Sequence, residues 1–267
     1  MSSTPPVLVT GGTGNLGRLV VPLLSGNGHR VRILSRRAHP SSYWVDVVVG
    51  DLATGDGIGA AVRGVATIVH CAGSARGDAD KARTLVRAAS ESGVRHLVNI
   101  SVVGVDRIPV RSPLERAAFG YYATKRAAEL VVAGSGLGWT TLRATQFHDL
   151  ILTVARRAAK LPVLPLPRGF RSQPVDAGEV ASRLVELALG EPAGLVPDMA
   201  GPRIYEIADL MRTYLRATDR HRVIVPMPMV GAAARAFRAG ANLAPGHAVG
   251  HRSWEDFLSD RLRDARN

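Results

Sequence analysis

Three residues of this 267-residue chain have the types and the spacing for acid–base chemistry on a bound oxygen atom. Tyr121 and Lys125 lie four positions apart, and Ser101 precedes the tyrosine by twenty positions. Residues at positions i and i+4 share one face of a helix, so the tyrosine and the lysine would point into the same cleft. Because a nearby ammonium favours the ionised form of a phenol, we expect Lys125 to lower the pKa of Tyr121 towards neutral pH.

Each member of this trio also has a purely structural interpretation. Tyr121 could be a half-buried aromatic residue of the helix, with its neighbour Tyr122 as the functional tyrosine. The hydroxyl of Ser101 could cap the backbone at the end of its own strand. The chain has only five tyrosines and three lysines, so a Tyr-x-x-x-Lys pattern is rare by chance and favours a functional pair.

A glycine-rich turn near the start of the chain has the spacing of a phosphate-binding loop. It is made of Gly11, Gly12, Thr13, Gly14, Asn15, Leu16 and Gly17. Two overlapping patterns, G-x-G-x-x-G and G-x-x-G-x-x-G, follow an apolar run and open a stretch with helical spacing, which is the order found in dinucleotide-binding folds. Glycine permits a tight turn and close approach of the backbone to a pyrophosphate, and the start of the helix supplies N–H groups to its oxygens.

The end of the second expected strand indicates which dinucleotide the site prefers. An NAD site holds the ribose 2′-hydroxyl with an acidic residue about 20 residues beyond the glycines. Here that place is taken by Ser35, Arg36 and Arg37, and two guanidinium groups suit a 2′-phosphate. The sequence therefore predicts NADP(H) in preference to NAD(H), although surface arginines of an arginine-rich chain would leave the same pattern.

Apolar runs alternate with helical patterns through the first 160 residues. Strands are expected at 7–10, 30–35, 45–49, 66–70, 96–101 and 140–142. Helices are expected at 16–24, 57–63, 80–92 and 121–133. The alternation predicts an α/β fold with a doubly wound parallel sheet of the Rossmann type, and it places Ser101 at the carboxyl edge of the sheet, where such folds bind ligands.

Residues 161–267 depart from this pattern and are expected to form a small C-terminal substrate-binding lobe, packed on the 1–160 domain as one compact unit. The lobe begins with a proline-punctuated segment, 161–167, that cannot be helical. Helices are expected at 175–189, 205–218 and 254–263, and a strand at 223–225. The stretch 230–241 could be a membrane-surface helix, but a helix packed on the protein with its two arginines in water is the favoured interpretation.

The composition excludes several classes of protein. The net charge is +12, and 31 of the 34 cations are arginines spread along the chain, whereas a nucleic-acid-binding tail would concentrate them. The single cysteine, Cys71, rules out an internal disulfide framework, and the scattered histidines predict no metal site. Without a recognisable signal peptide or a membrane-spanning apolar run, we expect a cytoplasmic protein that binds a small-molecule substrate, with neither nucleic acid nor membrane as partner.

Taken together, these motifs resemble the short-chain dehydrogenase/reductase superfamily over nearly the whole chain, and most closely its atypical, nitrogen-metabolite-repressor-like (NmrA-like) branch. The likeness to the superfamily is carried by the glycine turn, Gly50-Asp51-Leu52, Cys71-Ala72-Gly73, Ser101 and Tyr121-x-x-x-Lys125. The likeness to the branch is carried by 121–129, 142–149 and 173–176. The branch often has a proline where this chain has Ala144.

The resemblance implies a role for each matched residue. Besides the turn, those that would bind the dinucleotide are Asp51 and Leu52 at the adenine, Ala72 and Gly73 under the adenine ribose, and Cys71 beside them. At the reacting end, Lys125 would hold the nicotinamide ribose, Ser101 would hydrogen-bond the reacting oxygen, and Tyr121 would deliver a proton while the nicotinamide gives hydride. On the substrate side, near the nicotinamide, would lie Phe147 and His148.

Three functions from different classes are compatible with these residues. The first is an NADPH-dependent oxidoreductase of the short-chain type that reduces a carbonyl, quinone or conjugated enone. The second is a non-catalytic NADP(H) redox sensor that binds a regulatory protein, since the branch includes members without catalysis. The third is a nucleotide-sugar epimerase or dehydratase, for which a lobe of about 100 residues is small. The complete trio favours the reductase, and pairing through helices 80–92 and 121–133 could form a homodimer.

Overall fold

The computed structural model describes residues 5–73 and 77–264, which group by their contacts into two units. Unit 1 consists of Met1–Ser101, Gly120–Arg143 and Gly178–Pro197. Unit 2 consists of Val102–Phe119, Ala144–Ala177 and Asp198–Asn267. Because the chain passes repeatedly from one unit to the other, these units differ from the chain-order division into 1–160 and 161–267, which stays a prediction.

Unit 1 is built on a seven-stranded sheet with the strand order β3-β2-β1-β4-β5-β6-β9. Its strands are β1 Val7–Thr10, β2 Val31–Ser35, β3 Val45–Val49, β4 Thr67–His70, β5 His96–Val102, β6 Gly138–Ala144 and β9 Gly194–Leu195. β1 pairs in parallel with β2 and β4, β2 with β3, β4 with β5, and β6 with β9. The strand order reverses at β1, so the carboxyl ends of β1 and β4 flank the switch point at which doubly wound folds bind ligands.

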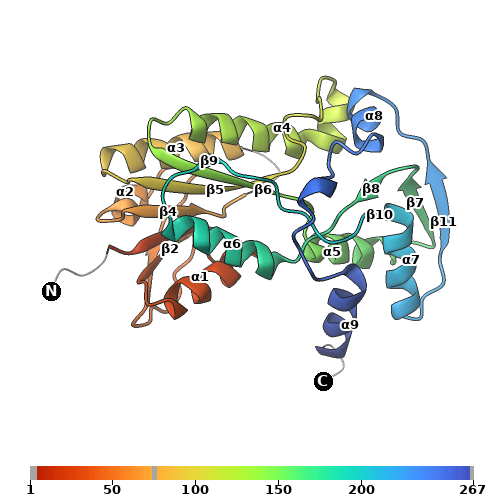
Figure 1. Ribbon diagram of the computed structural model, residues 1–267, viewed down its shortest axis with the longest axis horizontal. Helices are drawn as coiled ribbons and strands as arrows, with labels where there is room; N and C mark the ends of the chain where they lie inside the picture. Colours follow the sequence, from red (N-terminus) through yellow and green to blue (C-terminus); the bar gives the residue numbers. More distant parts are fainter. Residues whose placement is uncertain (1–4, 74–76, 265–267) are drawn as a thin grey trace. The chain divides into compact units, whose positions relative to one another are not determined.

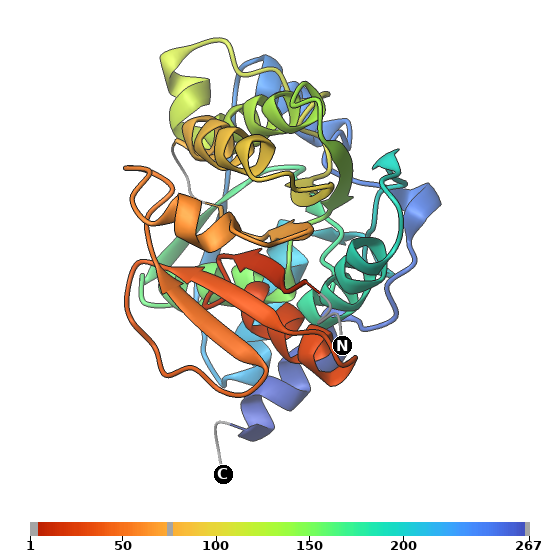
Figure 2. The same ribbon diagram turned by 90° about the vertical axis from the view of Figure 1, so that its left-hand side faces the viewer.

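Helices cover both faces of this sheet. They are α1 Gly17–Gly26, α2 Ile58–Val62, α3 Asp78–Glu91, α4 Pro113–Ala133 and α6 Ala177–Leu189. Figures 1 and 2 show α3 and α4 on one face and α1 and α6 on the other. Strands that are buried on both faces are largely apolar, which explains the many valine, leucine and isoleucine residues of the central strands. The predicted doubly wound parallel sheet of the Rossmann type is therefore confirmed.

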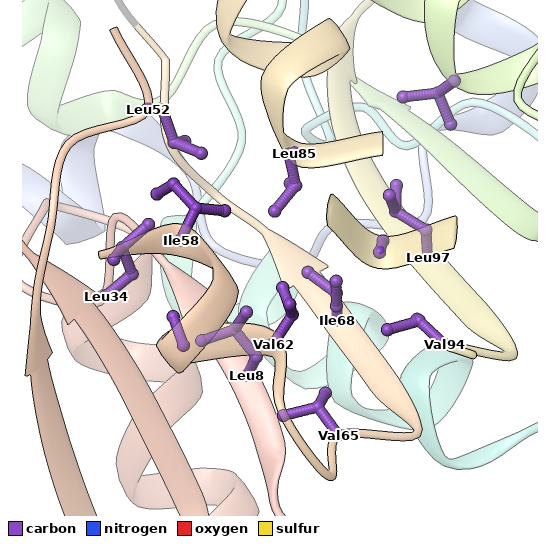
Figure 3. Close-up of a cluster of buried hydrophobic side chains, with 13 residues drawn as sticks. Leu8, Leu34, Leu52, Ile58, Val62, Val65, Ile68, Leu85, Val94 and Leu97 are labelled. Carbon is purple, nitrogen blue, oxygen red and sulfur yellow. The ribbon is translucent and has the colours of Figure 1, made fainter. Parts of the chain in front are cut away.

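The main core of unit 1 lies between the sheet and the helices α2, α3 and α4 (Figure 3). Its buried members are Leu8, Leu34, Leu52, Ile58, Ala61, Val62, Val65, Ile68, Leu85, Ala89, Val94, Leu97 and Val132. Burial of each large aliphatic side chain stabilises the fold by roughly 1.5–3 kcal/mol. This core holds in place the strands whose carboxyl ends carry the candidate site.

Helix α4 begins eight residues before its predicted start. Ser112 and Glu115 form a capping box: the Glu115 N–H donates to Ser112 Oγ (3.1 Å), and Glu115 Oε2 accepts from the Ser112 N–H (3.1 Å). Pro113 takes the first helical position, where no backbone N–H is needed. The Ser-Pro-Leu-Glu sequence carries this signal, so the early start could have been predicted from the residues alone.

Unit 2 contains four helices and two small sheets among its described residues. Its helices are α5 His148–Ala158, α7 Ile207–Ala217, α8 Ala232–Arg238 and α9 Trp254–Asp264, with a short 3-10 helix, η1, at Pro245–His247. Strands β7 Val163–Pro167 and β11 Val223–Met227 pair in parallel, and β8 Arg171–Ser172 pairs antiparallel with β10 Tyr205–Glu206. The proline-punctuated segment is therefore a strand, and α5 is a helix that the sequence analysis did not predict.

The core of unit 2 is formed by α5, α7 and α9 together with one face of β7. Its largest members are aromatic, and they include Tyr214, Trp254 and Phe257. The Trp254 indole N–H donates to the Leu210 carbonyl oxygen (3.2 Å), which satisfies the one polar atom of that side chain. In the part of the chain that the structure describes, no helix is long and apolar enough to cross a membrane.

Candidate active site

The glycine turn after β1 is packed so closely that side chains are excluded at two positions. Gly11 has a φ of 69°, and a Cβ there would lie 2.7 Å from the backbone nitrogen of Ala72. A Cβ on Gly17 would lie 2.2 Å from the carbonyl oxygen of Gly11 and would force the turn apart. The turn after β1 therefore touches the segment after β4, and the two segments meet at the switch point of the sheet.

The start of α1 is open to an anion. Thr13, Gly14 and Asn15 are exposed, and the Gly14 N–H closes the turn by donating to the Gly11 carbonyl oxygen (2.9 Å). Within the described structure, no side chain caps the N-terminus of α1, and its first turn has no acidic residue. The first N–H groups and the positive end of the helix dipole are thus available to phosphate oxygens. The turn fits a dinucleotide pyrophosphate, because backbone donors lie where side chains are excluded.

The segment after β2 presents two arginine side chains to solvent. Ser35 is buried at the end of the strand, and its Oγ accepts the Arg37 N–H (3.2 Å). Arg36 and Arg37 are both exposed, and neither forms an ion pair with the described residues. Their guanidinium groups can therefore pair with a phosphate without first breaking another contact.

The residues matched to the adenine end are divided between the surface and the core. Asp51 is half-buried, and its Oδ1 accepts the Ala53 N–H (2.9 Å). Leu52 is 5% exposed and belongs to the hydrophobic core of unit 1, so its side chain faces the core and not a ligand. Burial, opposed by the Lys125 charge, raises the pKa of Cys71 to about 12, so its thiol is not ionised at neutral pH.

Ser101 and Lys125 meet at the end of β5. The ammonium of Lys125 donates to the carbonyl oxygen of Ile100 (3.3 Å), the residue directly before the serine. Both side chains are buried. The Oγ of Ser101 has no hydrogen-bond partner among the described residues. A buried hydroxyl without a partner is unfavourable, and such a group is expected where a bound molecule completes the site.

Asp78, the first residue of α3, is a member of this cluster that the sequence analysis missed. Its carboxylate lies 3.6 Å from the Lys125 ammonium, and only 2% of the residue is exposed. A Cβ on Gly73 would lie 3.1 Å from the same ammonium and 3.6 Å from the carboxylate, so the segment after β4 passes alongside the pair. Asp78 lies just before the predicted start of this helix at residue 80, and nothing in the local sequence pattern connects it with the lysine.

The pKa of Tyr121 moves in the direction opposite to the prediction. Although 42% of the residue is exposed, desolvation of its phenol, followed by the negative charge of Asp78, raises the pKa of Tyr121 to about 12. Burial lowers the pKa of Lys125, and the same carboxylate opposes that change. The prediction was wrong because it counted the ammonium without the burial of the phenol and, after that, the carboxylate of Asp78. At neutral pH the phenol of Tyr121 is therefore protonated.

The neighbouring Tyr122 was the alternative candidate for the functional tyrosine. It is 8% exposed, and its ring packs edge-on against Tyr121 with 6.1 Å between the centroids. The two tyrosines lie four and three positions before Lys125, and both spacings place a side chain near the lysine, so spacing alone does not decide between them. The exposed Tyr121, which interacts with Asp78, is the better candidate for contact with a substrate.

His70 is a further polar residue at this edge that the sequence analysis missed. Its Nδ1 lies 2.7 Å from Oγ1 of Thr10, and this contact links the carboxyl ends of β4 and β1. Burial, and then the charges of Lys125 and Lys81, lower the pKa of His70 to about 3. The ring is neutral at neutral pH and holds the two strand ends together at the switch point. Only its place at the end of a strand could have drawn attention to it.

The two residues predicted on the substrate side belong to unit 2. The His148 ring is fully buried and stacks on Phe257 and Trp254, with centroid distances of 5.0 and 6.0 Å. Burial lowers its pKa, and its Nε2 lies 3.1 Å from the Arg252 carbonyl oxygen. His148 is thus a core histidine, and its side chain is not placed to line a substrate site; for the half-buried Phe147 that role stays a prediction. No cluster of three or more potential metal ligands occurs among the described residues.

Fold and site together define a dinucleotide-binding protein of the Rossmann class. The chain belongs to the NAD(P)H-binding family, whose sequence profile matches residues 11–191, from the glycine turn to just beyond α6. The NAD(P)-binding Rossmann domain that the resemblance to the short-chain dehydrogenase/reductase superfamily implies is thereby confirmed.

Two sequence relatives are named as reductases. A ceramide reductase of Caulobacter vibrioides is 29% identical over 208 residues, which are 71% of this chain and 63% of that protein. A (4-alkanoyl-5-oxo-2,5-dihydrofuran-3-yl)methyl phosphate reductase of Streptomyces griseus is 32% identical over 152 residues, which are 56% of this chain and 50% of that protein. The chain therefore spans between half and two thirds of the length of these relatives.

Solved structures with the same fold hold either dinucleotide. The NADPH-dependent quinone oxidoreductase QOR2 of Escherichia coli, solved with NADPH, has a TM-score of 0.78 at 16% identity and covers 96% of this chain and 99% of its own. The UDP-glucose 4-epimerase of Thermus thermophilus, solved with NAD, has a TM-score of 0.69 at 21% identity and covers 97% and 99%. At these identities the likeness shows the fold alone, so neither the choice of dinucleotide nor the reaction follows from it.

Proposed function

We propose that the protein is an NADPH-dependent reductase that acts on a carbonyl, quinone or conjugated enone of a small molecule. The observation that carries the proposal is the buried Ser101 hydroxyl, without a partner among the described residues and next to the carbonyl group that holds Lys125. The names of the two reductase relatives support the same class of reaction. Their substrates differ from one another, so the substrate class proposed here rests on the site.

Each residue of the cluster has one task in this reaction. When it is bound, NADPH supplies hydride to the carbon atom that is reduced. Ser101 donates a hydrogen bond to the substrate oxygen, and Tyr121 gives up the proton that balances the reduction. With a pKa of about 12, the phenol of Tyr121 holds its proton at neutral pH, as a proton donor must. Lys125 then supplies the positive charge that stabilises the phenolate left behind.

Asp78 holds Lys125 in place for this task and opposes the effect of the lysine charge on Tyr121. The carboxylate and the Ile100 carbonyl group fix the ammonium from two directions, at 3.6 and 3.3 Å. An unpaired ammonium in a buried site would tend to lose its proton, and the carboxylate keeps it charged. The same negative charge adds to the effect of burial in raising the pKa of Tyr121, so Asp78 favours both a charged lysine and a protonated tyrosine.

The preference for NADPH rests on the segment after β2. Arg36 and Arg37 are exposed, and the segment contains no carboxylate that would hold a ribose 2′-hydroxyl or repel a 2′-phosphate. Two guanidinium groups form charge-assisted hydrogen bonds with a phosphate, and these are roughly twice as strong as neutral ones.

The decisive experiment measures NADPH and NADH oxidation over a panel of quinones, enones, ketones and aldehydes, with Tyr121→Phe and Tyr122→Phe assayed beside the wild type. We expect turnover with NADPH, and we expect Tyr121→Phe to lower kcat by about two to four orders of magnitude while leaving NADPH affinity unchanged. Tyr122→Phe removes the neighbouring hydroxyl and is the matched control, with near-wild-type turnover expected.

The outcomes separate the candidate functions. Full activity in Tyr121→Phe would refute the role given to that phenol, and loss of activity only in Tyr122→Phe would transfer the role to its neighbour. Tight NADPH binding with no turnover on any substrate would contradict the reductase and favour a non-catalytic redox sensor. Purified protein that arrives with tightly bound NAD would favour the sugar-nucleotide class instead.

A further inference from the structure

The small parallel sheet of unit 2 has apolar side chains on both of its faces. The register of β7 and β11 pairs Leu164 with Ile224 on one face and Val163 with Val223 on the other. Leu164 belongs to the core of unit 2, and Ile224 packs against that core. Val163 and Val223 are instead 44% and 63% exposed. A sheet with one face in water normally alternates apolar and polar residues, and this sheet does not.

The exposed side of this sheet, which we call the apolar face, runs along both strands. It is formed by the register pairs Val163 and Val223, Pro165 and Val225, and Pro167 and Met227, with exposed Leu161 and Val230 just outside the strands. Val225 and Met227 are 41% and 48% exposed. Single exposed apolar residues are ordinary on protein surfaces, whereas a continuous strip of them marks an interaction site.

The segments that flank this face are rich in cations. The flanking segments 156–168 and 216–230 contain Arg156, Arg157, Lys160, Arg168, Arg216, Arg220 and Arg222, and all except Arg222 are exposed. The one acidic residue in the two segments is Asp219. Because the two strands run parallel, the residues that precede them lie at the same end of the sheet. There the Arg222 Nε donates to the Ala159 carbonyl oxygen (3.1 Å). Arg168 lies at the opposite end of the sheet, where its backbone N–H donates to the Met227 carbonyl oxygen (3.0 Å).

We propose that the apolar face docks on the surface of an anionic lipid membrane. The aliphatic side chains of β7 and β11 enter the boundary between headgroups and acyl chains, and the surrounding arginines pair with the lipid phosphates. Charge complementarity supports this partner, because the segments that flank this uncharged face contain seven cations and one carboxylate. The lack of a segment that could span a bilayer predicts no membrane partner, but a peripheral surface of this kind needs no spanning segment.

Two other partners suit the apolar face less well. A site for single-stranded nucleic acid offers aromatic rings on which bases stack, and residues 161–168 and 223–230 contain no aromatic side chain. A second copy of the chain could add a strand along β11, but Pro226 and Pro228 make that strand a poor template for backbone pairing.

The test is co-sedimentation of the full chain with phosphatidylcholine vesicles that contain about one-third phosphatidylglycerol, and with phosphatidylcholine vesicles alone. We expect binding to the anionic vesicles that weakens as salt is added. The variant Arg156→Gln/Arg157→Gln/Lys160→Gln should reduce the partition coefficient on the order of a hundredfold. The variant Val225→Asp/Met227→Asp should reduce it by a similar factor, because two carboxylates would have to enter the membrane boundary.

Two control variants make the same kinds of change away from the apolar face. Arg63→Gln/Arg87→Gln/Arg95→Gln deletes three exposed cations of unit 1, and Leu130→Asp places a carboxylate on a helix position that is 56% exposed. Both should keep most of the binding, and thermal melting should show that every variant is folded. Absence of binding to anionic vesicles, equal binding to neutral ones, or equal losses in test and control variants would overturn the proposal. So would self-association that Val225→Asp/Met227→Asp abolishes, or tighter binding to single-stranded DNA than to vesicles.

Discussion

The main sheet of unit 1 and the small sheet of unit 2 are built from the same kind of strand, but their surroundings differ. Helices cover both faces of the main sheet, and polar side chains are buried at the carboxyl ends of its central strands, where Thr10, His70 and Ser101 lie. In the small sheet, β7 and β11 have one face in a core and one face in water. Their ends carry exposed arginines where the main sheet carries buried polar groups.

This difference shows that an apolar strand sequence indicates that both faces of the strand are to be buried. It does not indicate whether helices of the same chain or an outside partner bury them. Where the helices of the chain provide the cover, water is excluded and a buried charge such as Lys125 acts strongly on its neighbours. Where they do not, the apolar face is available to a partner outside the chain. The three predictions that follow test this contrast, beginning with the largest expected effect.

The first prediction concerns the turn at the covered edge. Gly17→Ala should lower NADPH affinity at least a hundredfold, because its Cβ would lie 2.2 Å from the Gly11 carbonyl oxygen and displace the backbone donors of the turn. Titration of the cofactor fluorescence measures this effect. Gly26→Ala, in the same helix, has no neighbouring atom within 4 Å of its new Cβ and should bind NADPH as the wild type does. Equal affinities for the two variants would mean that the turn does not hold the cofactor.

The second prediction compares the two faces of β7. Leu164→Ala should lower the free energy of unfolding by about 2–5 kcal/mol, because it opens a cavity in the core of unit 2. Val163→Ala, one residue away on the apolar face, should change it by less than about 1 kcal/mol. Chemical denaturation of both variants measures the difference. A large loss of unfolding free energy in Val163→Ala would show that this side chain is buried within the folded chain. The apolar face would then not be available to a membrane.

The third prediction concerns the buried carboxylate at the covered edge. Asp78→Asn removes a negative charge that raises the pKa of Tyr121, so that pKa should fall from about 12 towards its ordinary value of 10. The proposed reduction needs a protonated phenol, so the alkaline limit of activity should move to lower pH. Asp80→Asn alters an exposed carboxylate two residues away, which pairs with Arg83, and should leave both quantities unchanged.

An ultraviolet titration of tyrosinate, corrected with Tyr121→Phe, follows that pKa independently of turnover. An unchanged pKa in Asp78→Asn would mean that the carboxylate serves only the packing of α3. A shift in the titration without a shift in the pH profile of activity would leave the electrostatic role of Asp78 intact and would refute proton donation by Tyr121.

Local patterns were sufficient for much of the fold. The strands β1 and β3 were predicted to the residue, and the glycine turn, the alternation of strands and helices, and the Tyr121–Lys125 pair were all read from spacing. These features depend on neighbours within a few positions along the chain, where the periodicities of strand and helix apply directly. The capping box of Ser112 and Glu115 is equally local, so the early start of α4 was also predictable from the sequence.

Such local patterns could not predict contacts between residues that are far apart in the chain. The Asp78–Lys125 pair, the Thr10–His70 contact and the burial of His148 against Phe257 join residues that are far apart in the chain. The sign of the Tyr121 pKa shift was mispredicted for this reason, since it depends first on the burial of the phenol in the folded chain and then on the Asp78 carboxylate, which another helix supplies.

The sequence by itself determined that this chain is a dinucleotide-binding Rossmann protein with a tyrosine and a lysine on one helical face. Only the tertiary structure decided which charges surround that tyrosine and which apolar strands are left uncovered. The physical reason is common to both. Burial and electrostatic energy depend on distance in space, and the fold sets that distance for residues that lie far apart along the chain.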